Sequence, residues 1–264
     1  MRRLLHECFL EQARRTPVDV ALRHEGREIN FGALEASAGR IAAGLVARGI
    51  GSGSVVGLHM ERSIDQVAAL LGILESGAAV LPLPPAFPPA RREQILEVAS
   101  PAAVIDADAT RVESRGAVRE VLSVETLLAG PDAGAEDAGP RDEEAIAFVL
   151  SSSGSTGRPK LIARSHRSFF HRLSWTWQRH PFREGEVCCQ KAHVTTTHSI
   201  YELFEPLLMG VETVIVPDRE VRDLERFWEV MRAAGVTRLL IVPSPLRASL
   251  AMPGFDPPPL EVVV

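Results

Sequence analysis

Residues 151–160 have the composition of a phosphate-binding loop. The segment reads SSSGSTGRPK and lies between two apolar runs that read as strands. Gly154 and Gly157 allow a tight turn and a close approach of the backbone to a ligand. Four serines and a threonine add hydroxyl donors beside the backbone N–H groups, and Lys160 adds a mobile cation. We expect phosphate oxygens to bind here, because a flexible linker rarely ends in Pro-Lys between two strands.

This segment is not a Walker A motif. That motif is G-x-x-x-x-G-K-[ST] at the start of a helix. Here Gly154 and Gly157 are too close together, and Lys160 leads into the strand-like residues 161–163. A P-loop NTPase or a kinase is therefore disfavoured.

A second group of polar side chains follows the strand-like residues 186–190. His193 and His198 flank the run Val194-Thr195-Thr196-Thr197, shortly before the helix predicted at residues 200–209. Either histidine could contact a substrate, and a surface or structural role explains each of them as well. Cys188 and Cys189 lie in the strand with no base motif nearby, so a cysteine nucleophile is not expected.

Alternating helices and strands would position both groups. Apolar residues recur at helical spacing in residues 34–45, 64–74 and 224–234, among others. Strands separated by helices of this length favour a mainly parallel sheet covered on both faces. The predicted fold is α/β, with two parallel-sheet subdomains. Its strands are expected at residues 54–60, 79–83, 103–105, 145–150, 161–163, 186–190, 213–216 and 239–242.

The chain is expected to divide near residue 140. Residues 129–144 are rich in Gly, Ala, Pro and acidic residues, as in a linker or a long surface loop. We therefore expect one α/β subdomain at residues 1–140 and a second at 141–264. The final residues, 260–264, read as a core strand, and a parallel strand normally leads into a helix or an active-site loop. This favours a part of a longer enzyme over a natural C-terminal strand.

Composition excludes several classes of protein. The formal net charge is -5 and basic residues are interspersed with acidic ones, so no nucleic-acid partner is predicted. No apolar run approaches the length of a membrane span, and the N-terminus does not read as a signal peptide. Three cysteines, two of them adjacent, fit neither a disulfide framework nor a zinc site, so a cytoplasmic protein is expected.

Several motifs together resemble the adenylate-forming (AMP-binding) superfamily. Residues 148–160 are similar to its Thr/Ser/Gly-rich phosphate loop, and residues 55–79 to two earlier motifs. Gln190-Lys191 and residues 199–210 resemble the motif beside the acyl pocket. Because these motifs occur in family order over nearly the whole chain, the sequence most resembles the N-terminal portion of a nonribosomal peptide synthetase adenylation domain.

This resemblance implies an enzyme that uses ATP and Mg²⁺ to activate a carboxylic acid as an acyl-adenylate. The acyl group would pass to a thiol, on the phosphopantetheine of a carrier protein or on coenzyme A, and the peptide-synthetase motifs favour the carrier protein. Lys160 would be the catalytic residue. The ATP-binding residues would be Ser152, Ser153, Gly154, Ser155, Thr156, Gly157 and Lys160, and the substrate-binding residues Thr197, His198 and Tyr201.

The sequence departs from the family pattern in three places. Leu161 stands where the loop usually has glycine after its lysine. Thr197 stands where domains that activate α-amino acids carry aspartate, and a hydroxyl cannot neutralise a buried ammonium. Four later features of the family would lie beyond Val264: the magnesium-binding glutamate, the ribose-binding aspartate, the hinge and the C-terminal lysine. Glu202 is not that magnesium-binding glutamate, because it belongs to the earlier helix motif, which it is expected to cap or orient. We therefore expect the small C-terminal domain to be absent from this sequence.

These departures define the expected substrate and the alternatives. The acid should lack a free α-amine, as hydroxy, keto, aryl and fatty acids do, with a β-amino acid as the next candidate. One alternative is a fragment of an acyl-CoA or aryl-acid ligase, which Thr197 favours. Another is an inactive remnant or partner-binding module that keeps the fold. We expect little or no adenylate formation by these 264 residues alone.

Overall fold

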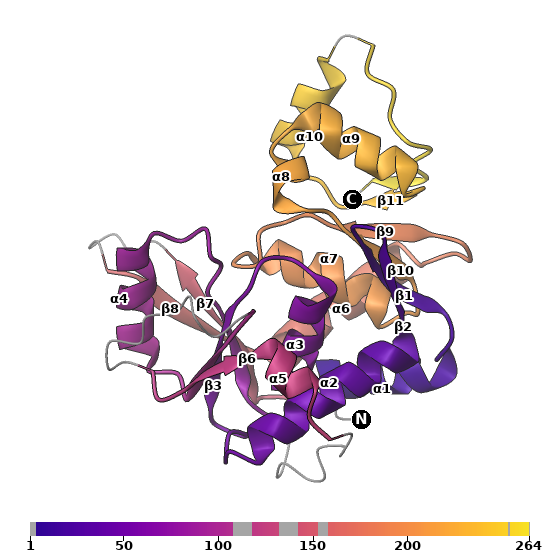
Figure 1. The fold of residues 1–264 in the computed structure, drawn as a ribbon. Coiled ribbons are helices and arrows are strands. Elements are labelled where there is room, and N and C mark those ends of the chain that lie inside the picture. Colours follow the sequence, from indigo (N-terminus) through magenta and orange to yellow (C-terminus); the bar gives the residue numbers. More distant parts are fainter. Residues whose placement is uncertain (1–3, 108–117, 132–141, 153–157, 253, 264) are drawn as a thin grey trace.

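The protein is an α/β structure in which helices cover three β-sheets (Figure 1). The computed structural model describes residues 4–107, 118–131, 142–152, 158–252 and 254–263. The predicted fold class is confirmed, although both larger sheets are mixed, each having one antiparallel pair of strands.

The larger sheet has six strands in the order β6-β5-β3-β4-β7-β8. Its neighbours are parallel except β7 and β8, which pair antiparallel. Their connection is too short for the crossover that parallel neighbours need, so they form a hairpin. The Ser/Gly-rich segment predicted to bind phosphate connects these two strands. The strands are β3 (Val55–His59), β4 (Ala79–Pro82), β5 (Ala103–Asp106), β6 (Val121–Ser123), β7 (Ile146–Ser152) and β8 (Lys160–Ser165).

The second sheet has four strands in the order β2-β1-β10-β9. Glu25 and Gly26 close the β1–β2 hairpin with positive φ angles of 48° and 79°, as a two-residue hairpin turn requires. β1 pairs parallel with β10, and β10 pairs parallel with β9. The strands are β1 (Val20–His24), β2 (Arg27–Asn30), β9 (Val187–Gln190) and β10 (Glu212–Ile215), and a small third sheet pairs β11 (Arg238–Leu239) with β12 (Val262–Val263).

The sheets do not follow the subdomain boundary expected near residue 140. The six-stranded sheet takes β3 to β6 from before that position and β7 and β8 from after it, while the four-stranded sheet joins β1 and β2 to β9 and β10. Local hydrophobic patterns indicate where a strand begins, and they carry no information about its partner in the sheet. The strand expected at residues 239–242 is also shorter than predicted, because β11 ends at Leu239 and Pro243 begins a helix.

Helices α2 and α3 pack directly against each other in the largest hydrophobic core. A Cβ at Gly72 of α3 would lie 2.7 Å from the carbonyl oxygen of Ala38 in α2, so only glycine allows this approach. The helices are α1 (Leu5–Arg15), α2 (Phe31–Val46), α3 (Ile64–Glu75), α4 (Pro89–Ala99), α5 (Val124–Leu128), α6 (His166–Arg179), α7 (Thr197–Leu207), α8 (Asp218–Val221), α9 (Leu224–Ala233) and α10 (Pro243–Leu250).

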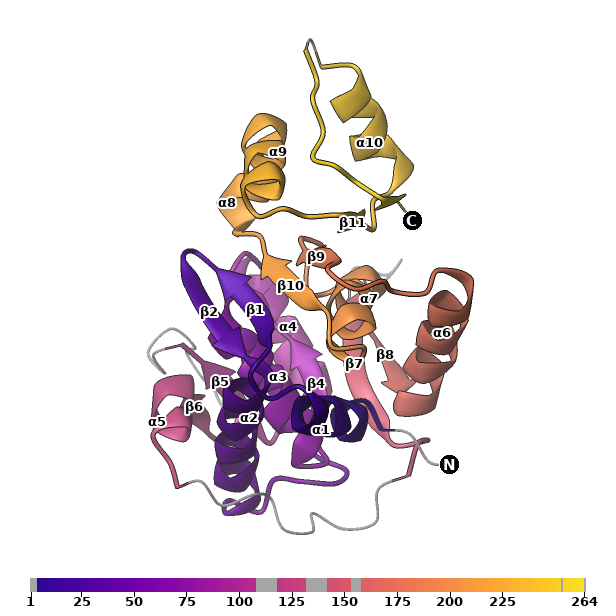
Figure 2. The ribbon, with the colours of Figure 1, turned by 90° about the vertical axis from the view of Figure 1, so that its right-hand side faces the viewer.

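The two larger sheets share one hydrophobic core. Helices α8, α9 and α10 lie outside this core. Figures 1 and 2 show α1, α2 and α3 on one side of the four-stranded sheet and α8, α9 and α10 on the other. A separate apolar cluster fixes α9 to this sheet and includes Cys189, Val214 and Trp228. Among the described residues, no helix has both the length and the apolar character needed to cross a lipid bilayer.

Candidate active site

A charged cavity lies where the parallel strands of both large sheets end. It has a volume of about 430 Å³ and borders the segments that follow β3, β4, β9 and β10. Its lining includes Arg62, Arg219, Arg222, Asp218 and Glu25. In open α/β sheets, ligands bind outside the carboxyl ends of the strands, so this edge is the expected location of a site.

An apolar pocket of about 360 Å³ lies beside this cavity, next to α7 and α9. Its volume falls in the range of small-molecule sites, which are mostly apolar with a few polar groups. The apolar part of the wall consists of Val221, Leu224, Phe227, Leu240, Ile241, Val242 and Pro245. The remaining lining residues are Lys191, Ala192, His193, Thr196, His198 and Glu202.

The amino end of α7 forms one edge of the apolar pocket. Thr196 is the residue that caps this helix, and its hydroxyl accepts a hydrogen bond from the Ser199 N–H group at 3.4 Å. The same hydroxyl donates to the carbonyl oxygen of His193 at 2.9 Å, which fixes the segment before the helix. The first turn of a helix carries partial positive charge, so a carboxylate near this end would be favoured.

Glu202 connects α7 to the end of β9. Its carboxylate accepts hydrogen bonds from the backbone N–H groups of Lys191 at 2.8 Å and Ala192 at 2.6 Å, and from Lys191 Nζ at 2.6 Å. The Glu202 side chain is only 2% exposed, so these donors are needed to stabilise its charge. The expectation that Glu202 orients this motif agrees with these contacts, in which both carboxylate oxygens already accept hydrogen bonds.

The residues predicted to bind substrate occupy three different positions. His198 lines the apolar pocket. Thr197 is the first residue of α7, is partly exposed, and is not among the described residues that line either cavity. Tyr201 packs into the core with its ring centroid 5.9 Å from that of Phe169, and burial raises the pKa of its hydroxyl. Thr196, which the sequence did not assign, is in the wall; its position before a predicted helix was the available signal.

The predicted phosphate loop spans the turn of the β7–β8 hairpin. Five of its predicted ligands lie outside the described residues, namely Ser153, Gly154, Ser155, Thr156 and Gly157. Ser152 and Lys160 form the last described pair of the hairpin, and the Ser152 hydroxyl donates to the Lys160 carbonyl oxygen at 3.4 Å. Lys160 is exposed. Because β7 lies parallel to β4, its described end at Ser152 points to the same edge of the sheet as the end of β4, whose following residues line the charged cavity.

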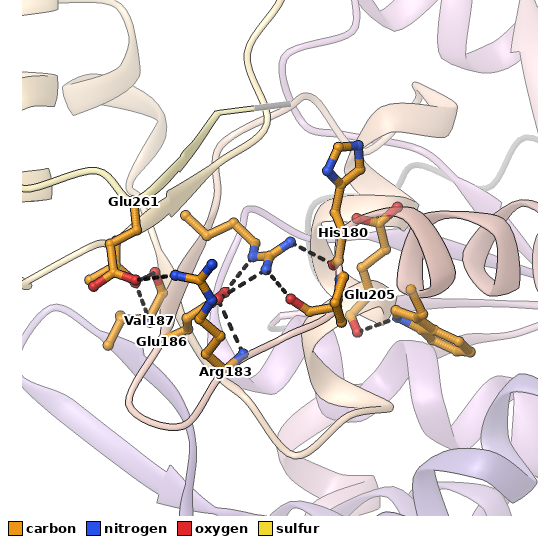
Figure 3. Close-up of polar contacts among 10 residues, drawn as sticks. His180, Arg183, Glu186, Val187, Glu205 and Glu261 are labelled. Atoms are coloured by element: carbon orange, nitrogen blue, oxygen red, sulfur yellow. Dashed lines mark hydrogen bonds and ion pairs between the residues drawn. The ribbon is translucent and has the colours of Figure 1, made fainter.

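A buried ion pair fixes the amino end of β9 to β11. The side chains of Glu186 and Arg238 are 2% and 7% exposed and form two hydrogen bonds, one of them 3.0 Å long (Figure 3). Arg238 also donates to the carbonyl oxygens of His180 at 3.0 Å and Pro181 at 2.9 Å. An arginine with this many acceptors is held in one geometry. The segments after β9 and β11 both line the apolar pocket, so this pair maintains their spacing.

The neighbouring cysteines take no part in the site. Burial raises the pKa of Cys188 to about 12 and raises the pKa of Cys189 as well. A thiol with such a pKa is protonated at neutral pH and is a poor nucleophile. Among the described residues, no three His, Cys, Asp or Glu side chains gather in a group that could hold a metal ion.

Comparison with known proteins identifies the family. A family model described as AMP-binding enzyme matches residues 9–262. The chain belongs to the AMP-binding enzyme family. This AMP-binding chain is 31% identical over 95% of its length to the vanchrobactin synthetase VabF of Vibrio anguillarum, and 32% identical over 94% to the beta-alanyl-bioamine nonribosomal peptide synthetase ebony of Drosophila melanogaster. It spans 9% and 31% of the lengths of these relatives.

Solved structures of AMP-binding enzymes have the same fold. The nonribosomal peptide synthetase FmoA3 superposes with a TM-score of 0.85 at 27% identity, covering 94% of this chain and 26% of that one. The N-terminal subdomain of Klebsiella oxytoca NpsA superposes with a TM-score of 0.82 at 26% identity, covering 91% and 61%. The chain therefore has the fold of part of the N-terminal subdomain of a peptide-synthetase adenylation domain.

Proposed function

We propose that the protein containing this chain activates a carboxylic acid as an acyl-adenylate. An oxygen of the carboxylate attacks the α-phosphorus of ATP, the bond from that phosphorus to the bridging oxygen breaks, and pyrophosphate leaves. Positioning of the two reactants and stabilisation of phosphate charge provide most of the acceleration in such a step. Family membership supports this reaction, and one of the similar structures is an AMPPNP-bound form of FmoA3.

Lys160 and the hairpin turn before it are proposed to bind the ATP phosphates. Lys160 is exposed at the start of β8, opposite the carboxyl end of β7, where its ammonium can reach a ligand. The hydroxyl-rich turn would add hydrogen-bond donors from Ser152 onward. Mg²⁺ is proposed to bind together with the ATP phosphates, as it does in other nucleotide sites, where it keeps several water ligands.

We infer that the acid lacks a free α-ammonium. The observation that carries this inference is the state of Glu202, the one carboxylate among the described residues of the apolar pocket, which already accepts three hydrogen bonds from Lys191 and Ala192. An ammonium in the pocket would meet hydroxyl groups and imidazoles with no anionic partner, and burying an unpaired charge is costly. Burial lowers the pKa of His193, so this imidazole is neutral at pH 7.

Similar proteins differ in the acids that their descriptions name. One NpsA structure contains 3-hydroxybenzoyl-AMSN, which supports an aryl acid, and ebony is described as a beta-alanyl synthetase, which supports a β-amino acid. FmoA3 has been solved with α-methyl-L-serine-AMP, which has an α-amine. The apolar lining of the pocket favours an aryl, keto, hydroxy or fatty acid for this protein.

A carrier protein is the proposed acceptor of the acyl group. An artificial fusion of NpsA and ThdA is described as an adenylation–PCP di-domain, and the curated relatives are peptide synthetases. Coenzyme A is the second candidate, because an acid without an α-amine is also the substrate class of aryl-acid and acyl-CoA ligases. The two acceptors can be compared directly by thioester formation in the full-length protein.

The test of the acid class is a panel of paired substrates. Pyrophosphate release by the full-length protein is measured with each L-α-amino acid and with its des-amino analogue. We expect the des-amino acid to be used equally well or better. If an L-α-amino acid exceeds its analogue by more than about tenfold, equivalent to about 1.4 kcal/mol, the site does recognise the ammonium and the inference is wrong.

A further inference from the structure

His193 lies between the charged cavity and the apolar pocket. It is the one described residue that lines both of them. Arg62, Asp218 and Arg222 belong to the charged side, whereas Phe227 and Ile241 belong to the apolar side. The two cavities therefore approach each other at a single side chain.

The ring of His193 is held from two directions. Its Nδ1 atom lies 2.8 Å from the Thr195 hydroxyl. Its centroid lies 6.1 Å from that of Phe87, with 31° between the ring planes, and Phe87 follows β4 in the other large sheet. The backbone two residues earlier is fixed by Glu202 through Lys191 and Ala192. These contacts orient the ring, although the residue is partly open to solvent.

We propose that His193 is a partition that limits the length of the carboxylic acid accepted by the apolar pocket. This inference rests on the proposed function, because it concerns the same acid. An alkyl chain that fills the apolar pocket and continues toward the charged cavity would meet this ring, because His193 lines both. The charged cavity beyond it has apolar surfaces from Met60, Pro85 and Val194, which would contact a longer chain once the ring is removed.

Binding of straight-chain carboxylic acids of increasing length tests the partition. Dissociation constants are measured by calorimetry for the full-length wild-type protein and for its His193→Ala variant, which opens the wall. His193→Phe keeps a ring of similar size. His171→Ala removes an exposed histidine of α6 that lines neither cavity and is the control for folding.

We expect affinity to rise about fourfold for each added methylene, equivalent to about 0.8 kcal/mol, until the wild-type pocket is filled. In His193→Ala the rise should continue, so that an acid two methylenes beyond the wild-type limit binds about 15-fold more tightly than to wild type. His193→Phe and His171→Ala should keep the wild-type limit.

Two results would overturn the proposal, and they are distinguishable. If the wild type binds acids and His193→Ala stops gaining affinity at the same length, His193 is not a partition, whereas the acid pocket stands. If the wild type binds no acid of any length, the proposed function fails for this pocket and the partition fails with it.

Discussion

A single carboxylate connects the two elements that form the polar wall of the apolar pocket. Glu202 accepts three hydrogen bonds at the end of β9 while almost fully buried, and such a group is stable only when all its donors are present. The family motif indicated that Glu202 orients a helix. Its partners could not be predicted, because the backbone N–H groups of residues 191–192 become free donors only where β9 ends.

Glu202→Gln should therefore destabilise the protein strongly. The carboxamide presents an NH₂ group to donors and loses the negative charge beside Lys191. We expect the free energy of unfolding, measured with urea at pH 7, to fall by about 3 kcal/mol. Lys191→Met is the matched variant: it removes one donor and keeps both backbone N–H groups, so its loss should be smaller. A change below about 0.5 kcal/mol for Glu202→Gln would contradict this role.

At the scale of single elements, the sequence was informative about helices. Apolar residues at helical spacing predicted α2, α3 and α9, since each of these helices buries one face or more. Helix starts are marked by Asn30 and Ser63, whose side chains accept hydrogen bonds from Ala33 and Gln66. Strand lengths were less predictable. The strand expected at residues 239–242 ends at Leu239, because the next three residues line the apolar pocket and Pro243 begins α10.

Gly72→Ala tests the contact between α2 and α3. The new methyl group would lie 2.7 Å from both the Ala38 carbonyl oxygen and Ile41 Cβ, so the helices must separate. We expect a loss of about 1–3 kcal/mol in unfolding free energy. Gly39→Ala is the matched control on α2, because its methyl group would meet only Glu75 Oε1 at 4.0 Å and should stabilise the helix by up to about 1 kcal/mol. Equal effects of the two substitutions would refute the close approach.

Glu205 of α7 should make stability depend on pH. Burial raises its pKa above the ordinary value of 4.5, despite a hydrogen bond from Thr176 and the charges of Arg172 and Arg238. The folded state thus holds this proton more tightly than the unfolded state. The resulting stabilisation is present below pH 4.5 and is lost as pH rises through the raised pKa.

The Glu205→Gln side chain has no acidic proton, so the variant should not lose stability as the pH rises through the pKa of Glu205. Melting temperatures of the variant and the wild type are compared from pH 4 to pH 8. We expect the variant to gain stability relative to the wild type as the pH rises. A difference that stays constant over this range would show that Glu205 does not carry the dependence.

At the scale of the whole molecule, the arrangement of the sheets departs most from expectation. Each large sheet combines strands from the two halves of the chain, and the charged cavity likewise joins residues 24–86 to residues 193–222, whereas the apolar pocket is lined by residues 191–245 alone. Motif similarity predicted the family correctly, because motifs depend on local residue types, whereas the assignment of phosphate binding to residues 151–160 stays a prediction. The position of His193 between two cavities depends on which strands are neighbours, and no local pattern encodes that.

The central claim is that ATP binds at the turn between β7 and β8. Hydrogen exchange of the chain, with and without ATP and Mg²⁺, tests it most directly. The account predicts slower exchange in residues 151–160 of the wild type when ATP is present. Lys160→Ala should bind ATP at least about tenfold more weakly, equivalent to about 1.4 kcal/mol. Without ATP, the exchange of this variant outside residues 151–160 should equal that of the wild type, which shows that its fold is intact. Unchanged exchange in this segment at saturating ATP, or equal binding by Lys160→Ala, would contradict the claim.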